Sequence, residues 1–236
     1  MSTFLKLAQD YAREARFAQL SASISTVIGQ TGRNLEAVEA IKEAYIDIQN
    51  RYFNWRWMEH RFSLQTVADT GTYAYTDATD EATASAIDRF SHWIFDDMQP
   101  LTVYLTSGGV GSEHDLVAID WDSFRWLYRR GTQNAQYPQH YSIDPQNNLV
   151  FGPIPNGIYT ISGSYQRGPQ LLELDADVPD MPAQYHNLIW AYALEIYGLN
   201  HAANNILVKS ARLAKRRMRQ LEGNQLPAIP TAGPMV

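Results

Sequence analysis

The sequence predicts an α+β fold, in which N- and C-terminal helices form a helical bundle that carries an inserted β-rich module. Apolar residues recur at helical spacings of three and four near both ends of the chain. Residues 137–166 instead carry a β-hairpin signature, with turn-forming Asn, Gly and Pro residues and a period of two over residues 158–166. A linker rich in Asp and Pro, residues 175–182, then leads directly into a helix start. A chain that begins and ends helical, with strands between, indicates a helical body with an insertion.

This pattern divides the chain into an N-terminal helix with its connector, a bundle built from two separate segments, the β-rich module and an extended C-terminal arm. In that order, the expected regions are residues 1–33, 34–58 with 180–223, 59–179 and 224–236. A chain of 236 residues is long enough for one domain with an insertion.

Composition narrows the functional classes. The chain has no cysteine, which excludes disulfides, thiolate metal sites and thiol nucleophiles. Its 19 basic and 25 acidic residues give a net charge of −6, which argues against a general nucleic-acid binder. The N-terminal segment carries acids between its apolar residues, so it predicts neither a secretory signal nor a membrane span. We therefore expect a soluble protein without a membrane partner.

Two helices are expected before residue 58. The first is amphipathic and covers residues 3 to about 20. The second begins at Asn34, a favourable N-cap residue, and carries an apolar seam. The seam consists of Val38, Ile41, Tyr45, Ile48, Tyr52 and Trp55.

The β-rich module begins near residue 60, where Phe62 and Leu64 alternate with polar residues. A helix is expected within residues 82–98, stopped by Pro100. Its shared face would contain Ile87, Phe90, Ile94 and Met98. Residues 101–106 alternate again as a strand, and the glycine-rich segment after them predicts a flexible tip.

The best-marked hairpin joins residues 149–155 to a strand over residues 158–166. The turn formers Asn147-Asn148 and Asn156-Gly157 bracket its first strand. Beyond it, the acidic linker is expected to cap the next helix.

The helix after the linker runs from Tyr185 to Leu199 and is apolar around most of its circumference, which favours burial or a position between subunits. A last helix over residues 202–222 ends at Gly223. The chain then continues as an uncharged, proline-rich arm from Leu226, about 35 Å long if fully extended.

Basic residues gather on the last helix, on the side opposite its apolar residues: Lys209, Arg212, Lys215, Arg216 and Arg219. A solvated face explains such a run, and contact with phosphates or with an acidic protein explains it as well. Aromatic side chains are favoured at protein interfaces, although they also fill ordinary cores. The candidates for contact between subunits are Trp55, Trp57, Trp190 and Tyr197.

No catalytic residue, metal site or cofactor is predicted. Glu113-His114-Asp115 is a dense run of potential metal ligands, but adjacent side chains in a glycine-rich loop do not converge on one ion. The linker acids Asp175, Asp177 and Asp180 lack the spacing of a calcium loop. His186 and His201 are expected to be hydrogen-bonded structural histidines.

In the order of its motifs, the chain resembles the head-to-tail adaptor, or connector, proteins of tailed bacteriophages. The matching features include a helix ending in paired tryptophans, a pattern of prolines and tyrosines in the module, and an acidic linker into an aromatic helix. The residues that carry them are Trp55, Trp57, Phe62, Leu64, Val67, Pro138, Tyr141, Leu149 to Pro155, Gly157, Tyr159, Arg167, Pro169, Leu171, Asp177 to Pro182, Tyr185 and His186.

The resemblance implies a ring of copies, expected to be a dodecamer, that lies under the portal protein at the virion neck and extends its channel. The expected partners are the portal, neighbouring copies, tail or nozzle proteins, and passing double-stranded DNA without sequence specificity. Assembly would take place in the bacterial host cytoplasm. The portal-binding arm would comprise Leu226, Pro227, Ile229, Pro230, Pro234, Met235 and Val236.

Two alternatives remain open from the sequence. The chain could be an aromatic-rich binding module of a decoration or tail protein, with a carbohydrate or protein ligand, if exposed tryptophans line a groove. An enzyme would require at least two of four residues to converge in a pocket. Those residues are His92, His114, Asp115 and His140.

Overall fold

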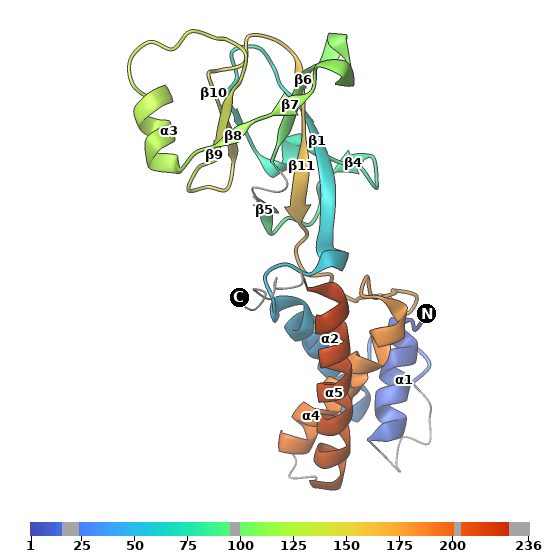
Figure 1. Cartoon of the computed structure of the whole chain (residues 1–236). Coiled ribbons are helices and arrows are strands. Elements are labelled where there is room, and N and C mark those ends of the chain that lie inside the picture. Colours follow the sequence, from blue (N-terminus) through green and yellow to red (C-terminus); the bar gives the residue numbers. More distant parts are fainter. Residues whose placement is uncertain (16–23, 95–99, 201–203, 227–236) are drawn as a thin grey trace, which may run out of the picture. The chain divides into compact units, whose positions relative to one another are not determined.

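The chain folds into two compact units (Figure 1), one comprising Met1–Met58 with Pro169–Val236 and the other Glu59–Gly168. The computed structural model describes residues 1–15, 24–94, 100–200 and 204–226. One unit is helical and the other is rich in strands. The predicted α+β class is therefore confirmed.

The helical unit is organised around α4, which packs against each of the unit's other long helices. Its elements are α1 (Phe4–Glu14), α2 (Gly32–Asn50), α4 (His186–Asn200), α5 (Asn204–Gln225) and the 3₁₀ turns η1 (Arg56–Met58) and η5 (Ala183–Tyr185). Helix α4 is apolar on most sides, and its Leu188, Ile189 and Leu194 are buried. Burial on several sides gives α4 its central position.

The N-terminal boundaries differ from those predicted. Helix α1 begins after Thr3, whose hydroxyl accepts a hydrogen bond from the Lys6 amide at 3.3 Å. Residues 16–20 of the first predicted helix lie outside the described residues. The predicted N-cap at Asn34 is wrong, because α2 already begins at Gly32. The side-chain amide of Asn34 instead donates to the side-chain oxygen of Gln30 at 3.0 Å.

The predicted seam of α2 is correct only as far as Ile48. The helix ends at Asn50, so Tyr52 and Trp55 lie beyond it. The chain turns there, and the buried indole of Trp55 donates to the carbonyls of Ile48 and Gln49, both at 3.1 Å. Because the last carbonyls of a helix lack intrahelical partners, this side chain completes the end of α2.

The acidic linker belongs to the helical unit, whereas the sequence placed residues 169–179 in the β-rich module and residues 1–33 apart from the bundle. The amides of Phe4 and Leu5, at the start of α1, donate to the carbonyls of Asp177 and Asp175. The Val27 amide donates to the Asp175 carboxylate at 2.6 Å. The expected capping of the next helix is wrong, since η5 has no side-chain cap. The linker instead supplies acceptors to α1.

At the other end of the unit, α5 continues through Gly223 to Gln225, so the predicted stop at Gly223 is wrong. A Cβ atom added at Gly223 would have no neighbouring atom within 4 Å. This glycine therefore serves no close contact or left-handed turn. Leu226 then packs against the helical core, and its amide bonds the Glu222 carbonyl at 3.0 Å. An arm can begin only after Leu226.

The β-rich unit contains two sheets among its described residues. The larger has the order β4-β3-β1-β11-β6-β7, with β5 also paired to β11, and the smaller has the order β2-β10-β9-β8. The strands are β1 (Glu59–Gln65), β2 (Thr72–Tyr73), β3 (Thr79–Asp80), β4 (Ser85–Ala86), β5 (His92–Ile94), β6 (Thr102–Leu105), β7 (His114–Asp115), β8 (Val117–Ala118), β9 (His140–Ile143), β10 (Leu149–Gly152) and β11 (Tyr159–Gln166). All the pairs are antiparallel except β8 with β9.

Short elements complete the β-rich unit. They are the helix α3 (Trp121–Tyr128) and the 3₁₀ turns η2 (Tyr75–Asp77), η3 (Thr106–Gly108) and η4 (Val110–Ser112). The predicted strands at Phe62 and at residues 101–106 are confirmed as β1 and β6. The glycine-rich tip forms η3, η4 and the start of β7.

The predicted helix within residues 82–98 is wrong. Two short strands, β4 and β5, occupy its described part, and Met98 lies outside the described residues. Asp80 turns the chain first, because its carboxylate accepts from the amides of Ala82 and Thr83. Trp93 is then buried on β5 beside Tyr165 of β11. Pairing with β11 therefore overrides the helical spacing of the apolar residues.

The predicted hairpin between residues 149–155 and 158–166 is also wrong, although both segments contain strands. Strand β10 pairs with β9 and β2, whereas β11 pairs with β1, β5 and β6 of the other sheet. Pro153 and Pro155 lack amide donors and lead the chain out of the ladder between the two strands. The turn at Asn147, with φ of 63°, instead joins β9 to β10.

A buried carboxylate links three strands of the larger sheet. Asp80 accepts from the Tyr165 hydroxyl at 2.7 Å and contacts His60 Nδ1 at 2.8 Å, besides its two backbone donors. Burial favours the neutral acid, but hydrogen bonds from Tyr165, Ala82 and His60 outweigh it and hold the pKa of Asp80 below its usual range.

We expect Asp80→Ala to lower the free energy of unfolding of the β-rich unit by about 3–5 kcal/mol, because it removes the acceptor of the buried Tyr165 hydroxyl and the partner of the half-buried His60 ring. Since the pKa of Asp80 is lowered on folding, its contribution is complete above the usual aspartate pKa and is lost as pH falls through the folded value. The stability gap between wild type and Asp80→Asn, measured by urea unfolding, should therefore shrink below about pH 4. A gap that is constant from pH 7 to pH 3 would contradict this role.

Candidate functional site: charged faces of the helical unit

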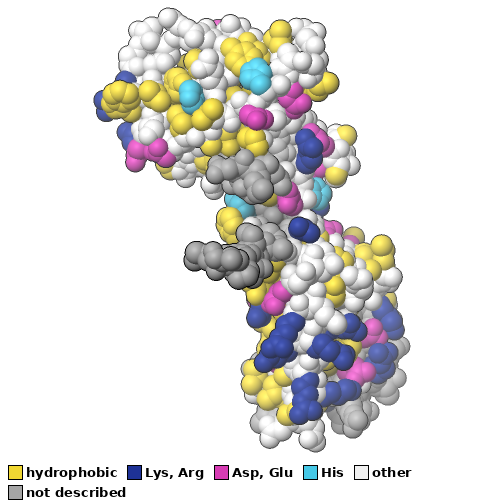
Figure 2. Space-filling view, viewed as in Figure 1, with side chains coloured by type: hydrophobic (Ala, Val, Ile, Leu, Met, Phe, Trp, Pro, Cys, Tyr) yellow, Lys and Arg dark blue, Asp and Glu magenta, His cyan; other side chains and the backbone are white. Residues whose placement is uncertain are grey.

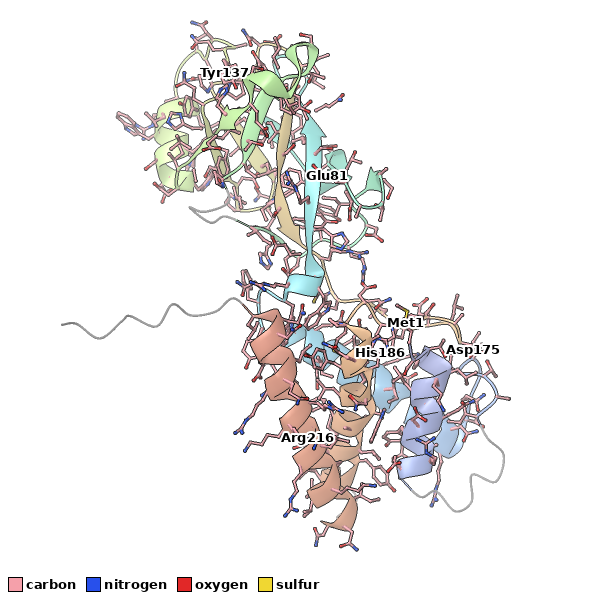
Figure 3. The ribbon with its side chains drawn as sticks, turned by 45° about the vertical axis from the view of Figure 1, so that its right-hand side comes forward. Met1, Glu81, Tyr137, Asp175, His186 and Arg216 are labelled. Atoms are coloured by element: carbon pink, nitrogen blue, oxygen red, sulfur yellow. The ribbon has the colours of Figure 1, made fainter. Side chains whose placement is uncertain are left out.

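The basic residues predicted on the last helix form one exposed face of α5, which we call the basic face. Its members are Lys209, Arg212, Lys215, Arg216 and Arg219, all exposed. Figure 2 shows Lys and Arg side chains gathered over the helical unit, and Figure 3 places Arg216 on α5. Ser210, Ala214, Met218 and Leu221 are buried. The helix is therefore amphipathic, as predicted.

The charges of the basic face are largely unmatched within the chain. Lys209 Nζ lies 2.8 Å from Glu14 of α1. Among the described residues, the other four bases of this face form no ion pair with an acid of the same chain. Adjacent like charges repel one another, so this face favours an anionic partner.

A second charged face, absent from the sequence prediction, lies on α2. Its acids recur at spacings of three, four and four, and we call it the acidic face: Glu36, Glu39, Glu43 and Asp47. All are exposed except Glu36, which is half-buried. Glu39 lies 3.0 Å from Lys42 on the same helix. The spacing alone could have revealed this face, because i, i+3 and i+7 share one side of a helix.

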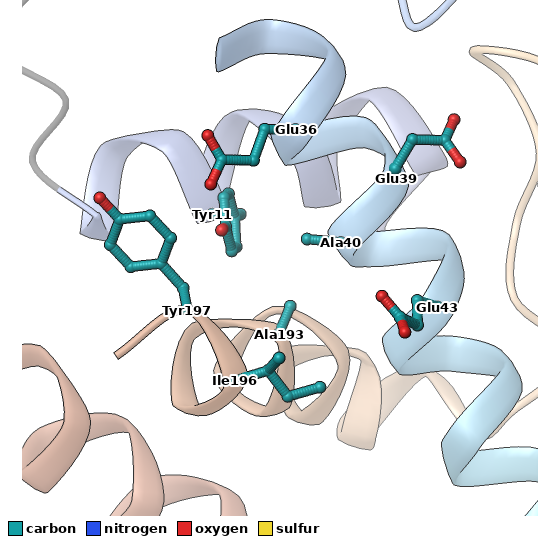
Figure 4. A pocket seen from close by; sticks show the side chains of 8 residues that line it. All are labelled: Tyr11, Glu36, Glu39, Ala40, Glu43, Ala193, Ile196 and Tyr197. Carbon is teal, nitrogen blue, oxygen red and sulfur yellow. The ribbon is translucent and has the colours of Figure 1, made fainter. Parts of the chain in front are cut away.

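A cavity of about 200 Å³ lies beside the acidic face, between α2, α4 and α1 (Figure 4). Its lining residues are Tyr11, Glu36, Glu39, Ala40, Glu43, Ala193, Ile196 and Tyr197. The rings of Tyr11 and Tyr197 are 6.3 Å apart and nearly perpendicular. Burial, with a contribution from Glu36, raises the pKa of Tyr11, so its hydroxyl stays neutral. The cavity thus combines carboxylates, tyrosine rings and an aliphatic wall.

The four aromatic candidates for subunit contact do not share one environment. Trp55 is fully buried in the chain's own core, so its selection was wrong. Trp57 packs against it, with ring centroids 4.3 Å apart and ring planes inclined at 32°. Trp57, Trp190 and Tyr197 are each half-buried against the helical core. Of these, Tyr197 lines the cavity.

The predicted portal-binding arm falls mostly outside the described residues. Leu226 is half-buried on the helical core and is therefore part of the helical unit. The other predicted arm residues lie outside the described part: Pro227, Ile229, Pro230, Pro234, Met235 and Val236. Their proposed role rests on sequence.

The histidines that could have supported chemistry are placed as follows. His186 accepts from the Ser2 amide at 3.1 Å and bonds the Met181 carbonyl at 2.8 Å, as expected of a structural histidine (Figure 3). Burial lowers the pKa of His186, so the neutral ring fits this arrangement. His114 stacks on Tyr137, and His140 bonds the Tyr128 hydroxyl at 2.7 Å. His201 lies outside the described residues.

Across the described ranges, no group of three or more His, Asp or Glu side chains is arranged to hold a metal ion. No helix in these ranges is both long and apolar enough to cross a membrane. Asp115 and His114 both lie on β7, at the surface.

Comparison with known proteins gives one family. The family model described as SU10 adaptor protein matches residues 2–231, which is nearly the whole chain and includes both units. No curated protein matches the chain.

Proposed function

Because the chain belongs to the SU10 adaptor protein family, we propose that it is a structural head-to-tail adaptor of a tailed phage. It binds beneath the portal protein at the virion neck, extends the DNA channel and receives tail proteins. The observation that carries this proposal is the family match across residues 2–231. The role requires binding surfaces and no catalysis.

In this role, neighbouring copies form a ring on the portal, with twelve copies expected from the resemblance to portal-bound adaptors. Double-stranded DNA passes through the ring without sequence-specific contacts. Because the chain carries a net charge of −6, its contact with the passing DNA is weak and transient. The two charged faces of the helical unit are available surfaces for assembly.

The alternative of an aromatic-rich binding module depends on exposed tryptophans that line a groove. All six tryptophans lie in the described part of the chain, and only Trp126 of α3 is largely exposed, at 63%. A cavity lies beside the start of α3, but the tryptophan among its lining residues is the half-buried Trp121. This arrangement does not favour a carbohydrate groove.

The proposal is tested by mixing the purified protein with its portal rings and examining the product by electron microscopy. We expect an added ring of density below the portal. The protein alone at micromolar concentration should be mainly monomeric. Ion pairs formed between exposed charged side chains of two copies would contribute only about 0.2–1 kcal/mol each. Portal particles that remain without added density at saturating adaptor concentration would refute the adaptor role.

A further inference from the structure

We propose that the basic face of one copy binds the acidic face of the neighbouring copy, so that the ring is closed by one repeated contact between α5 and α2. This inference rests on the proposed function, because it names the surfaces by which copies of an adaptor meet. The partner is a second copy of this chain.

The two faces are complementary in sign, length and spacing. Glu39, Glu43 and Asp47 recur at intervals of four and span about 12 Å of α2. Arg212, Arg216 and Arg219 recur at intervals of four and three and span about 11 Å of α5. Two helices laid side by side can therefore bring several opposite charges together at once. Such patterns fix register and exclude like-charged partners.

The cavity beside the acidic face suits arginine in particular. Its wall includes Ala40 and Ile196, along which the alkyl stem of an arginine can lie. Figure 4 shows Glu36 and Glu43 extending from α2 beside α4, with the ring of Tyr197 nearby. A guanidinium group can bond a carboxylate through two N–H groups and stack on an aromatic ring. A lysine offers neither feature.

A contact between the two faces would join two copies, because the chain does not pair its own basic and acidic faces. Helices α2 and α5 both pack on α4. Among the described residues, no ion pair joins the acidic face to the basic face. A contact between two different faces is heterologous, and repeated heterologous contacts produce either closed rings or open filaments. The portal would supply the template that selects the ring.

Charge reversal tests this contact. One variant carries Arg212→Glu, Arg216→Glu and Arg219→Glu, and a second carries Glu39→Lys, Glu43→Lys and Asp47→Lys. A third carries all six changes. The substituted residues are exposed, so each variant should fold, which circular dichroism and melting temperature would verify. The readout is the number of adaptor copies per portal ring, calculated from the measured mass of the portal–adaptor complex.

We expect each triple variant to bind portal with a deficit of copies, because like charges then face each other between neighbours. The variant with all six changes should regain much of the lost occupancy, since both faces have exchanged sign, although it no longer places an arginine beside the cavity. An equal mixture of the two triple variants should also regain occupancy, in an alternating ring. Wild-type occupancy by either triple variant, or no recovery in the two restored samples, would overturn the contact. Loss of DNA retention with normal occupancy in the Arg variant would assign the basic face to DNA instead.

A cross-linking test reads the contact without portal and therefore separates this inference from the proposed function. Because the chain has no cysteine, Glu43→Cys and Arg216→Cys introduce the only thiols. In concentrated protein, a short bis-maleimide should give the double variant a ladder of oligomers, whereas each single variant stops at dimers. The ladder should weaken as salt is raised. A double variant that yields no products beyond those of the single variants would refute the contact, even if the wild type binds portal.

Discussion

Replacing Trp55 by Ala is expected to lower the free energy of unfolding of the helical unit by about 3–5 kcal/mol, the usual range for a buried tryptophan. The side chain is fully buried, and its indole N–H bonds the carbonyls of Ile48 and Gln49. The substitution therefore opens a cavity and also leaves the end of α2 incomplete. Urea unfolding followed by circular dichroism at 222 nm would measure the loss, with the two units fitted separately.

Trp126→Ala is the matched control, because it removes the same side chain at a position that is 63% exposed on α3. Its effect should stay within about 0.5 kcal/mol. Trp55→Phe separates the two causes, since it retains much of the packing but loses the indole donor. Equal effects of Trp55→Ala and Trp126→Ala would show that Trp55 does not organise the core.

The position of Trp55 illustrates what helical periodicity can predict. The spacing that connects Val38 to Ile48 correctly identifies the buried side of α2. The same spacing extends to Trp55, but the helix has already ended. Periodicity beyond the end of a helix no longer indicates burial: Tyr52 fits the spacing but is exposed, whereas Trp55 is buried because the chain turns back to the same core.

Strand pairing in the β-rich unit could not be predicted from local sequence patterns, for a related reason. Alternation located most of β1, β6 and β11. It could not tell that β10 joins the smaller sheet, because neighbours in sequence need not be neighbours in a sheet. The helix expected over residues 82–98 was wrong because Trp93 is paired beside Tyr165 of β11. Cross-strand packing of this kind depends on residues distant in sequence, so local spacing does not reveal it.

The candidate surfaces also differ in how far the sequence alone reveals them. The basic face was evident in the sequence, because its residues are close together and of one sign. The acidic face was overlooked, since its residues alternate with the apolar seam of α2 over a longer stretch. The cavity beside it needed the fold, because α1 and α4 supply its other residues.

Removing residues 227–236 is expected to lower portal attachment on the order of 100-fold or more while the melting temperature stays nearly unchanged. This segment has three prolines, no charged side chain and the apolar residues Ile229, Met235 and Val236. A proline-rich segment loses little backbone entropy when it docks. One weak contact repeated around a ring becomes strong through avidity, so loss of all copies is severe. Co-sedimentation with portal measures attachment, and calorimetry measures stability.

The truncation must begin after Leu226, because that side chain packs on the helical core and its loss would destabilise the unit. A full-length variant with Ile229→Ser, Met235→Ser and Val236→Ser is the matched control for arm length. If the apolar side chains insert into clefts of the portal, this variant should attach as poorly as the truncated protein, although its reach of about 30 Å is retained. Wild-type attachment by the truncated protein would refute the arm's role. A large fall in melting temperature would mean that the segment stabilises its own subunit.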